Sequence, residues 1–349
     1  MEQRNRSIDF LRFLGAIAIM VAHADPPTWL AQIRNFGTPM LIIVSALSVV
    51  VVFRNRPFVA GTFLQKRLLR ITIPPWLFLT VFFGSALVVA DLLGTPFPFS
   101  SDVVVGSYAL TSGIGYLWIF KVYVIVALLT PVMLRFKASV PNRAVYFAII
   151  LCVYAGYEVF YAFLQVAVQN AVTMALIDDT LIVGLPYAVL FAYGLQLEEL
   201  ADRTIVWISI GSLLTFWALA LAKFQVTGHF VPTQFFKYPP RLYYLSYAIF
   251  CVNNLYLLSK SALVAKLPPR PIQWVSTNLM WIYLWHIPGI SVWDRMIGPT
   301  HGDFELVSLK LLFIVAFGVS ITYLQKRVVA ALLSYRPGRL TSLTSDYLG

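Results

Sequence analysis

Arg12 and His23 are unusual because both lie within residues 8–23, a segment otherwise apolar enough for a membrane-spanning helix. They are eleven positions apart, which on an α-helix is about 16 Å along the axis and roughly three turns. Both side chains should project from nearly the same face, at two depths of a hydrocarbon core about 30 Å thick. Such a pair could line a reaction site, since ionisable groups within membranes usually face the protein interior. Each residue alone could also be an interfacial anchor.

A second group is the basic stretch that contains Lys66, Arg67 and Arg70. On a helix, Arg67 and Arg70 share a face because they are three residues apart, and together they could clamp phosphate groups. The simpler interpretation is cytoplasmic positive charge in contact with lipid headgroups.

Two later segments also carry polar groups at membrane depth. Lys121 lies about one turn into the segment 115–134, where its side chain could snorkel outward or point into a cavity. Tyr283 and His286 are three residues apart in the segment 274–293, after a polar Ser-Thr-Asn sequence. They could belong to a reaction site or provide hydrogen bonds between helices. If this segment crosses from inside to outside, as 8–24 does, His286 should lie near the depth of His23.

Neighbouring residues leave further alternatives open. The aromatic residues beside Lys121, which include Tyr116, could form an ordinary interfacial belt or a platform on which sugars stack. Asp25 and Glu158 are the carboxylates expected at a depth comparable to that of the histidines, and either could orient one of them.

The composition indicates a polytopic membrane protein. Of 349 residues, 59% are hydrophobic and only 12% charged, and the mean hydropathy is +0.78, far from the values of soluble domains. The net charge of +11 is therefore interpreted as membrane topology rather than nucleic-acid binding. Neither Cys152 nor Cys251 has a Cys or His partner at ligand spacing, so no metal site is expected.

Apolar segments of spanning length recur about ten times, which predicts an all-α membrane protein with both termini on one side. A cleavable signal peptide ending near residues 22–24 is the less favoured alternative, because Asp9 and Arg12 interrupt its apolar region. The predicted spans are 8–24, 36–53, 72–93, 115–134, 144–165, 181–198, 204–222, 241–258, 274–293 and 306–325.

The loops predict the orientation. Those on the N-terminal side hold 18 of the 26 Lys and Arg residues, so both termini should be cytoplasmic. The opposite loops and their margins hold fewer, and Lys310 is placed among them. Pro-Pro pairs at 26–27, 74–75, 239–240 and 268–269 are expected at span borders. We expect one membrane domain over 1–327, a short cytoplasmic tail over 328–349, and no separate soluble domain.

These motifs, in this order, resemble the acyltransferase-3 family of multispanning membrane O-acyltransferases. The resemblance covers essentially the whole chain. It departs from the family pattern at Ala46, where glycine is usual, and at Lys121, where arginine is usual. The matching positions are Arg12, His23, Gly37, Pro39, Ser45, Arg67, Arg70, Ile71, Pro74, Leu117, Trp118, Pro131, residues 237–240 and residues 282–286.

The resemblance implies transfer of an acyl group, usually acetyl, from cytoplasmic acyl-CoA to a sugar hydroxyl. The acceptor would be an envelope or exported glycan, such as a polysaccharide or lipopolysaccharide, or a lipid-linked precursor, at the bacterial inner membrane. No metal cofactor is expected. Because CoA carries several phosphates, Arg12, Lys66, Arg67 and Arg70 are the expected donor-binding residues.

For the chemistry, we expect His23 to act as general base on the acceptor hydroxyl. His286, Tyr283 or Lys121 would donate hydrogen bonds to the developing oxyanion. An acyl-histidine intermediate is the competing route. The alternative function is a secondary transporter or a lipid or glycan flippase, whose buried cations would form a permeation path, although the repeats common in transporters are not evident.

Overall fold

The computed structural model describes the chain except for residues 1–4, 112, 171–172, 175–176, 178–182 and 336–349. The chain divides into two compact units. Unit 1 comprises Met1–Ala22, Pro27–Phe58 and Leu128–Ser276. Unit 2 comprises His23–Pro26, Val59–Ala127 and Thr277–Gly349. Two of the boundaries between the units fall inside helices, in α6 (Trp118–Ser139) and α13 (Pro269–Met296).

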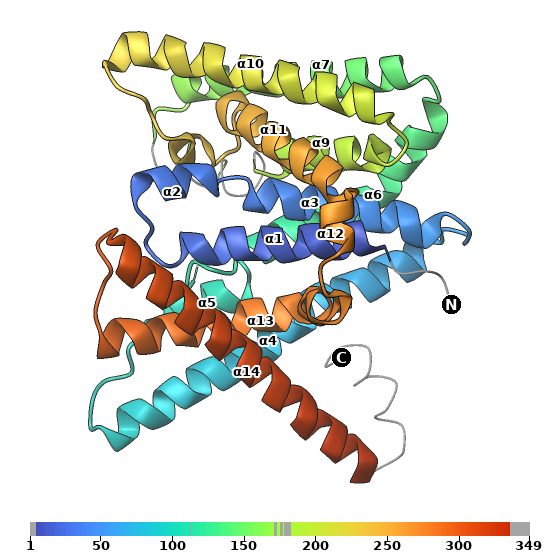
Figure 1. The fold of residues 1–349 in the computed structure, drawn as a ribbon. Coiled ribbons are helices and arrows are strands. Elements are labelled where there is room, and N and C mark those ends of the chain that lie inside the picture. The colour runs from blue at the N-terminus through green and yellow to red at the C-terminus, as the bar shows by residue number, and fades with distance from the viewer. Residues whose placement is uncertain (1–4, 112, 171–172, 175–176, 178–182, 336–349) are drawn as a thin grey trace. The chain divides into compact units, whose positions relative to one another are not determined.

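The prediction of an all-helical membrane protein is confirmed: the described residues form helices and no strand (Figure 1). Each predicted span overlaps a helix, although the first two residues of 181–198 lie outside the described part. By length and composition, six segments of the described chain are apolar enough to cross a membrane, so the count of ten and the cytoplasmic termini stay predictions. The six are Thr28–Phe53, Ala60–Leu92, Trp118–Ser139, Arg143–Ala167, Asp202–Thr227 and Phe304–Leu332.

The centre of unit 1 is formed by α3 (Gly37–Phe53) and α9 (Gly184–Leu197), which are buried along most of their length. Helix α1 (Arg6–Ala22) packs against α3. Glycine allows α9 to approach α3 closely, because a Cβ on Gly194 would lie 2.8 Å from both the Ala46 Cβ and the Ile43 carbonyl oxygen. Ala46, which departs from the family pattern, thus faces a residue that has no side chain.

The remaining helices of unit 1 surround this centre. α7 (Arg143–Ala167) packs on α9, and α10 (Asp202–Thr227) packs along α11 (Leu242–Ser259). Short helices lie in the connections: α2 (Thr28–Ile33), the 3₁₀ helix η2 (Thr233–Phe236) and α12 (Ala262–Ala265).

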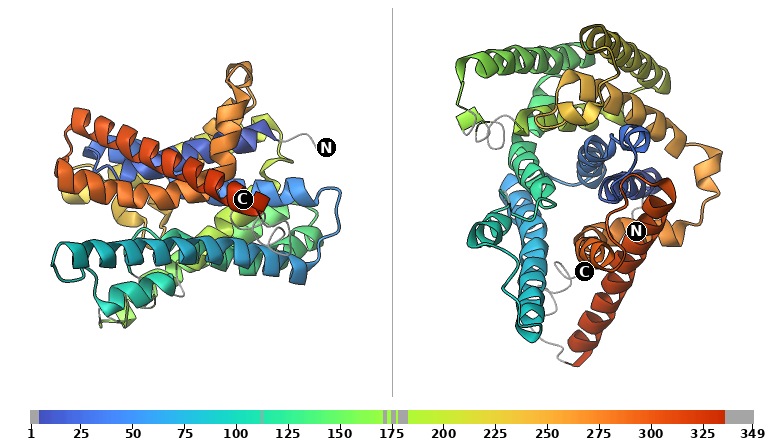
Figure 2. Two further views of the ribbon diagram at one scale, coloured as in Figure 1. Left: turned by 90° about the horizontal axis from the view of Figure 1, so that it is seen from below. Right: turned by 90° about the vertical axis from the view of Figure 1, so that its left-hand side faces the viewer.

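Unit 2 contains α4 (Ala60–Leu92), α5 (Ser101–Tyr108), the first part of α6, the second part of α13, and α14 (Phe304–Tyr335). Figure 2 shows α4 as one continuous helix, and Pro74 and Pro75 lie inside it. The proline pair therefore does not begin or end a helix, and its position at a span border stays a prediction. Helix α14 continues beyond residue 327, where the predicted tail begins, and the rest of that tail lies outside the described residues.

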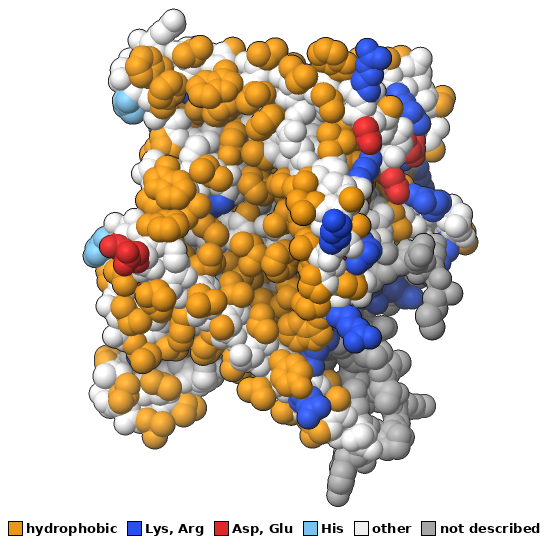
Figure 3. Space-filling view, in the orientation of Figure 1, with side chains coloured by type: hydrophobic (Ala, Val, Ile, Leu, Met, Phe, Trp, Pro, Cys, Tyr) orange, Lys and Arg blue, Asp and Glu red, His pale blue; other side chains and the backbone are white. Residues whose placement is uncertain are grey.

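The outer surfaces of these helices are apolar. Figure 3 shows hydrophobic side chains over most of the visible face, on α10 as well as on α14. Exposed residues of this kind include Trp207 and Leu214 on α10 and Leu309 and Leu312 on α14. Large apolar surfaces of this extent are typical of helices solvated by lipid.

Candidate active site

His23 and His286 form a hydrogen-bonded pair within unit 2. The Nδ1 atom of His23 lies 2.7 Å from Nε2 of His286, and the planes of the two rings are nearly parallel, with an interplanar angle of 14°. Helix α1 ends at Ala22, so His23 occupies the turn that follows it. His286 is fully buried on α13. Two histidines far apart in the sequence therefore meet side by side.

The hydrogen bonds determine which nitrogen of each neutral histidine carries the proton. Nδ1 of His286 contacts the backbone carbonyl oxygen of Tyr283, which can only accept, so this nitrogen is the donor. Nε2 of neutral His286 is then an acceptor, and Nδ1 of His23 donates to it. Nε2 of His23 remains the basic nitrogen of the pair.

Tyrosine rings surround the pair. The Tyr116 ring meets His23 edge-on at 4.7 Å between centroids, and the Tyr283 ring lies 4.8 Å from His286. The Tyr283 hydroxyl donates to the Tyr116 carbonyl at 2.6 Å, which joins α13 to the segment before α6. Gly115 precedes Tyr116 with φ +79, a left-handed conformation that glycine adopts without strain.

An ion-pair cluster holds the turn that carries His23. The ammonium of Lys310, on α14, lies 2.7 Å from Asp25 and 2.8 Å from Asp294. The Thr300 hydroxyl donates to the Ala24 carbonyl at 3.1 Å. Asp25 has φ +53, a conformation that costs energy for a residue with a side chain. The cluster thus fixes the backbone on the C-terminal side of His23.

Sequence reasoning does not identify this cluster. Lys310 lies inside an apolar helix rather than at a loop margin, and an ionisable residue in such a position is a signal of function. Asp25 binds Lys310 and not a histidine ring. Tyr116 packs on His23, which is a more specific position than an interfacial belt requires.

Helix α14 approaches α13 closely at the level of the histidine. A Cβ on Gly318 would lie 2.7 Å from the carbonyl oxygen of Ile282 and 3.4 Å from the backbone nitrogen of His286. The helix backbones are therefore in near contact here, which restricts the position of His286.

Lys121 and Arg12 are two further predicted site residues. Lys121 is half-buried in the first turn of α6, in unit 2. Arg12 belongs to unit 1, where its guanidinium donates to the Ser48 hydroxyl of α3 at 2.8 Å. The proposal that Arg12 and His23 share one stripe spans both units and stays a prediction.

The basic residues Lys66, Arg67 and Arg70 all lie on α4, in unit 2. Lys66 and Arg70 are exposed and Arg67 is half-buried. Because α4 is helical throughout this stretch, Arg67 and Arg70 are less than one turn apart, as two guanidiniums need to be for binding one phosphate group.

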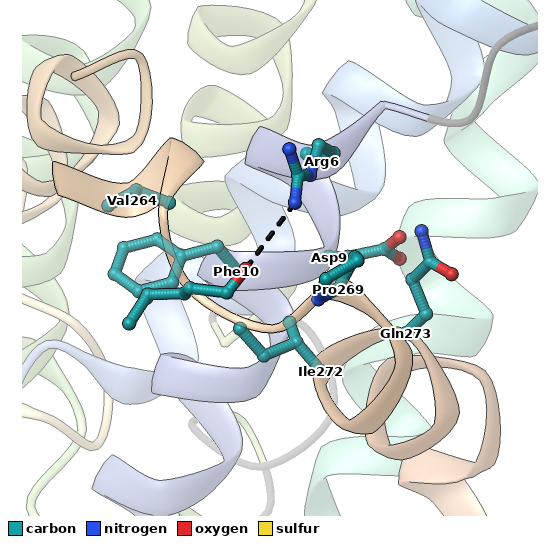
Figure 4. Close-up of a pocket in the computed structure, with 8 residues that line it drawn as sticks. Arg6, Asp9, Phe10, Val264, Pro269, Ile272 and Gln273 are labelled. Atoms are coloured by element: carbon teal, nitrogen blue, oxygen red, sulfur yellow. Dashed lines mark hydrogen bonds between the residues drawn. The ribbon is translucent and has the colours of Figure 1, made fainter. Parts of the chain in front are cut away.

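The start of α1 is fixed to the start of α13 within unit 1. The Ser276 hydroxyl donates to buried Asp9 at 2.6 Å, and Arg6 donates to the Leu267 carbonyl at 3.4 Å. Figure 4 shows the small pocket beside these contacts, which Phe10 and Ile272 also line. Its volume of about 10 Å³ is sufficient for roughly one water molecule, so it serves packing rather than substrate binding.

A larger pocket of about 190 Å³ also lies in unit 1, lined by residues that include Ser7, Leu47, Glu198 and Lys260. Among the described residues, no group of three or more His, Cys, Asp or Glu side chains is arranged to hold a metal ion.

A protein-family model described as an acyltransferase domain matches residues 5–324, nearly the whole chain. No curated protein and no solved structure matches the chain.

Proposed function

The chain belongs to the acyltransferase-3 family, and from that premise we propose that it is a membrane O-acyltransferase that uses acetyl-CoA as donor. The acceptor is a sugar hydroxyl of an envelope or exported glycan or of a lipid-linked precursor. The enzyme would lie in a bacterial inner membrane, with both termini in the cytoplasm. The hydrogen-bonded pair of His23 and His286 is the observation that carries the chemical part of the proposal.

His23 is the general base in this proposal. Its Nδ1 donates to His286, so its Nε2 can accept the proton of an acceptor hydroxyl. His286 in turn donates to the Tyr283 carbonyl, which fixes its own ring. The hydrogen bonds from His23 to His286 and from His286 to the Tyr283 carbonyl orient the His23 ring and stabilise the positive charge that it acquires. This is the role of the third group in a catalytic triad.

The transfer conserves atoms and charge. The hydroxyl oxygen bonds to the thioester carbonyl carbon while its proton passes to His23. The carbon–sulfur bond then breaks, and the CoA thiolate leaves and takes the proton from His23. The products are the O-acetylated sugar and CoA. In the competing route, His23 itself is acylated first.

The oxyanion that forms on the carbonyl oxygen requires donors. Lys121 is our first candidate, since it lies in the first turn of α6, which begins two residues after Tyr116. His286 and Tyr283 are the other residues expected in this role. Both nitrogens of His286 and the Tyr283 hydroxyl already have partners, which favours positioning roles for these two residues.

The donor would be held by cations. Arg67 and Arg70 on α4, with Lys66, suit the phosphates of CoA. Arg12 would contact a part of acetyl-CoA more distant from these phosphates. These assignments rest on residue type and on the family pattern.

The test is acetyl transfer by the purified full-length protein. Wild type, His23→Ala and His229→Ala would be incubated with radiolabelled acetyl-CoA and candidate glycans. His229 is the matched control, because it is an exposed histidine whose ring contacts the nearby Thr227 carbonyl. We expect label on the glycan with wild type and His229→Ala, and a loss of about 10²–10⁴-fold with His23→Ala.

Two outcomes would contradict the proposal. Equal transfer by His23→Ala and wild type would exclude His23 as the base. Absence of transfer to any acceptor, together with movement of a solute across liposomes, would favour the transporter alternative. Trapping of an acetylated His23 would establish the acyl-histidine route.

A further inference from the structure

The segment between α10 and α11 folds against the end of α2, within unit 1. Gln32 accepts hydrogen bonds from the backbone nitrogen of Thr233 at 2.9 Å and from its hydroxyl at 3.0 Å. Asn35 donates to the same hydroxyl at 2.8 Å. Tyr247, on α11, donates to the Ile33 carbonyl at 2.8 Å. Three segments are thereby fixed around one polar region.

Two cations meet in this region. Lys237 is buried, with 7% of its surface exposed, and Arg34 is half-buried. Burial, and next the charge of Arg34, lower the pKa of Lys237 to about 7. Two neighbouring positive charges in a buried setting oppose folding unless a negative charge offsets them.

A carboxylate on α7 is already engaged by the start of α11. Glu158 accepts from the Arg241 guanidinium and from the Leu242 backbone nitrogen, each at 2.6 Å. The Glu158 carboxylate therefore forms its ion pair with Arg241 rather than with Arg34 or Lys237.

Several buried polar atoms in the region have no hydrogen-bond partner among the residues that the structure describes. Three are donors: Nε of Arg34, Nε2 of Gln32 and the hydroxyl of Tyr244. Tyr244 is fully buried and lies within electrostatic range of Arg34. Two are amide acceptors, on Asn35 and Gln234. Native proteins rarely leave this many buried groups unsatisfied in one place, and each one needs an explanation.

We propose that Arg34, Lys237 and Tyr244 bind a phosphate group, and that the ligand is a sugar phosphate. The guanidinium, the ammonium and the hydroxyl are donors that match phosphate oxygens, and two cations match its charge. The amide oxygens of Asn35 and Gln234 are acceptors suited to sugar hydroxyls. The site lies in unit 1 and takes no part in the histidine chemistry.

The test measures binding directly. Purified full-length protein in neutral detergent would be titrated calorimetrically with glucose 1-phosphate, inorganic phosphate, glucose, and sodium chloride at matched ionic strength. We expect saturable binding of both phosphates, tighter for the sugar phosphate, and none for glucose or chloride. Arg34→Gln should weaken glucose 1-phosphate binding about tenfold or more.

Matched control variants distinguish binding at this site from a general effect of the positive charge of the protein. Arg203→Gln and Lys266→Met change exposed residues of the same unit and should bind as wild type does. Tyr244→Phe removes only the unpartnered hydroxyl and should weaken binding several-fold without disturbing the fold. Lys237→Met should act in the same direction as Arg34→Gln.

Lipid is the other source of a phosphate group. Nanodiscs of phosphatidylglycerol and of phosphatidylcholine distinguish it, because an anionic headgroup in the site would compete with glucose 1-phosphate only in the first. That competition would overturn the assignment to sugar phosphate. Equal binding by wild type, Arg34→Gln and Tyr244→Phe, with folding verified by circular dichroism, would overturn the site itself. Neither result bears on the acetyl-transfer assay.

Discussion

The ammonium of Lys310 lies 2.7 Å from the carboxylate of Asp25, two residues after His23. The side chain of Lys310 is 1% exposed, while those of Asp25 and Asp294 are 57% and 44% exposed. Lys310 therefore joins α14 to the turn that presents His23, and two partly hydrated carboxylates balance its buried charge.

Replacing Lys310 with Met should lower the free energy of unfolding by about 1–3 kcal/mol, since it leaves two neighbouring carboxylates without their cation. Partial exposure of the carboxylates keeps the loss below that of a fully buried pair. Thermal unfolding in detergent would measure the loss of stability. An acetyl-transfer assay on the same variant would measure its activity. Asp25→Asn combined with Lys310→Met should cost less than the sum of the single losses, and strict additivity would show that the two residues are not coupled.

His286→Ala should reduce kcat about 100-fold, with the KM for acetyl-CoA nearly unchanged, because His23 would lose its acceptor and its orientation. His286→Gln retains an oxygen near the position of Nε2 and should recover part of the rate. Steady-state kinetics across a pH series would report both effects. Identical kcat values for wild type and His286→Ala would remove His286 from the mechanism.

Gly318→Ala should lower both activity and melting temperature, since the new methyl group meets the Ile282 carbonyl oxygen at 2.7 Å and must displace the backbone beside His286. Gly211→Ala on α10 is the control, because a Cβ there meets nothing within 4 Å. That change should be neutral or slightly stabilising through helix propensity. Equal activity and equal melting temperature in the two variants would show that the close contact of α14 with α13 does not restrict His286.

Arg67→Gln with Arg70→Gln should raise the KM for acetyl-CoA about tenfold or more and leave kcat within a few-fold, as expected for loss of phosphate contacts. Lys266→Gln alters an exposed cation in unit 1 and is the control. A fall in kcat alone would assign the two arginines a different role.

The lowered pKa of Lys237 predicts that the free energy of unfolding depends on pH. Its pKa is lowered from 10.5 to about 7, so between these values the unfolded chain binds a proton that the folded chain lacks. Stability should therefore rise with pH above the folded-state pKa, by about 2 kcal/mol over roughly two pH units. Arg34 stays charged in this range, and the raised pKa of Tyr238 keeps its hydroxyl neutral. The melting temperature of Lys237→Met should depend less on pH than that of wild type, and parallel curves would contradict the assignment.

Much of the helical architecture follows from the sequence, because long apolar segments must satisfy their backbone groups as helices. The meeting of His23 and His286 is consistent with the expectation of similar depth, since both segments are predicted to run from inside to outside. The partners of Lys310 could not be predicted. Asp25 is 285 residues away, and a periodic pattern on one helix does not indicate which distant carboxylate faces it.

The local structural preference of proline gave a wrong prediction in α4. Pro74 and Pro75 are expected to end a helix, because proline lacks the backbone donor and crowds the preceding turn. In α4 the helix continues through both residues, which are buried. The two prolines themselves are packed inside the structure, and sequence reasoning applied to one segment cannot weigh that packing against the local preference.

The contact between α3 and α9 has an evolutionary consequence. The Ala46 methyl group is one obstacle to a side chain at position 194, because a Cβ there would lie 2.8 Å from it. The Ile43 carbonyl oxygen is a second obstacle, also at 2.8 Å, and no exchange at position 46 removes it because it belongs to the backbone. Position 194 should therefore stay glycine wherever this pair of helices is retained, whichever small residue occupies position 46.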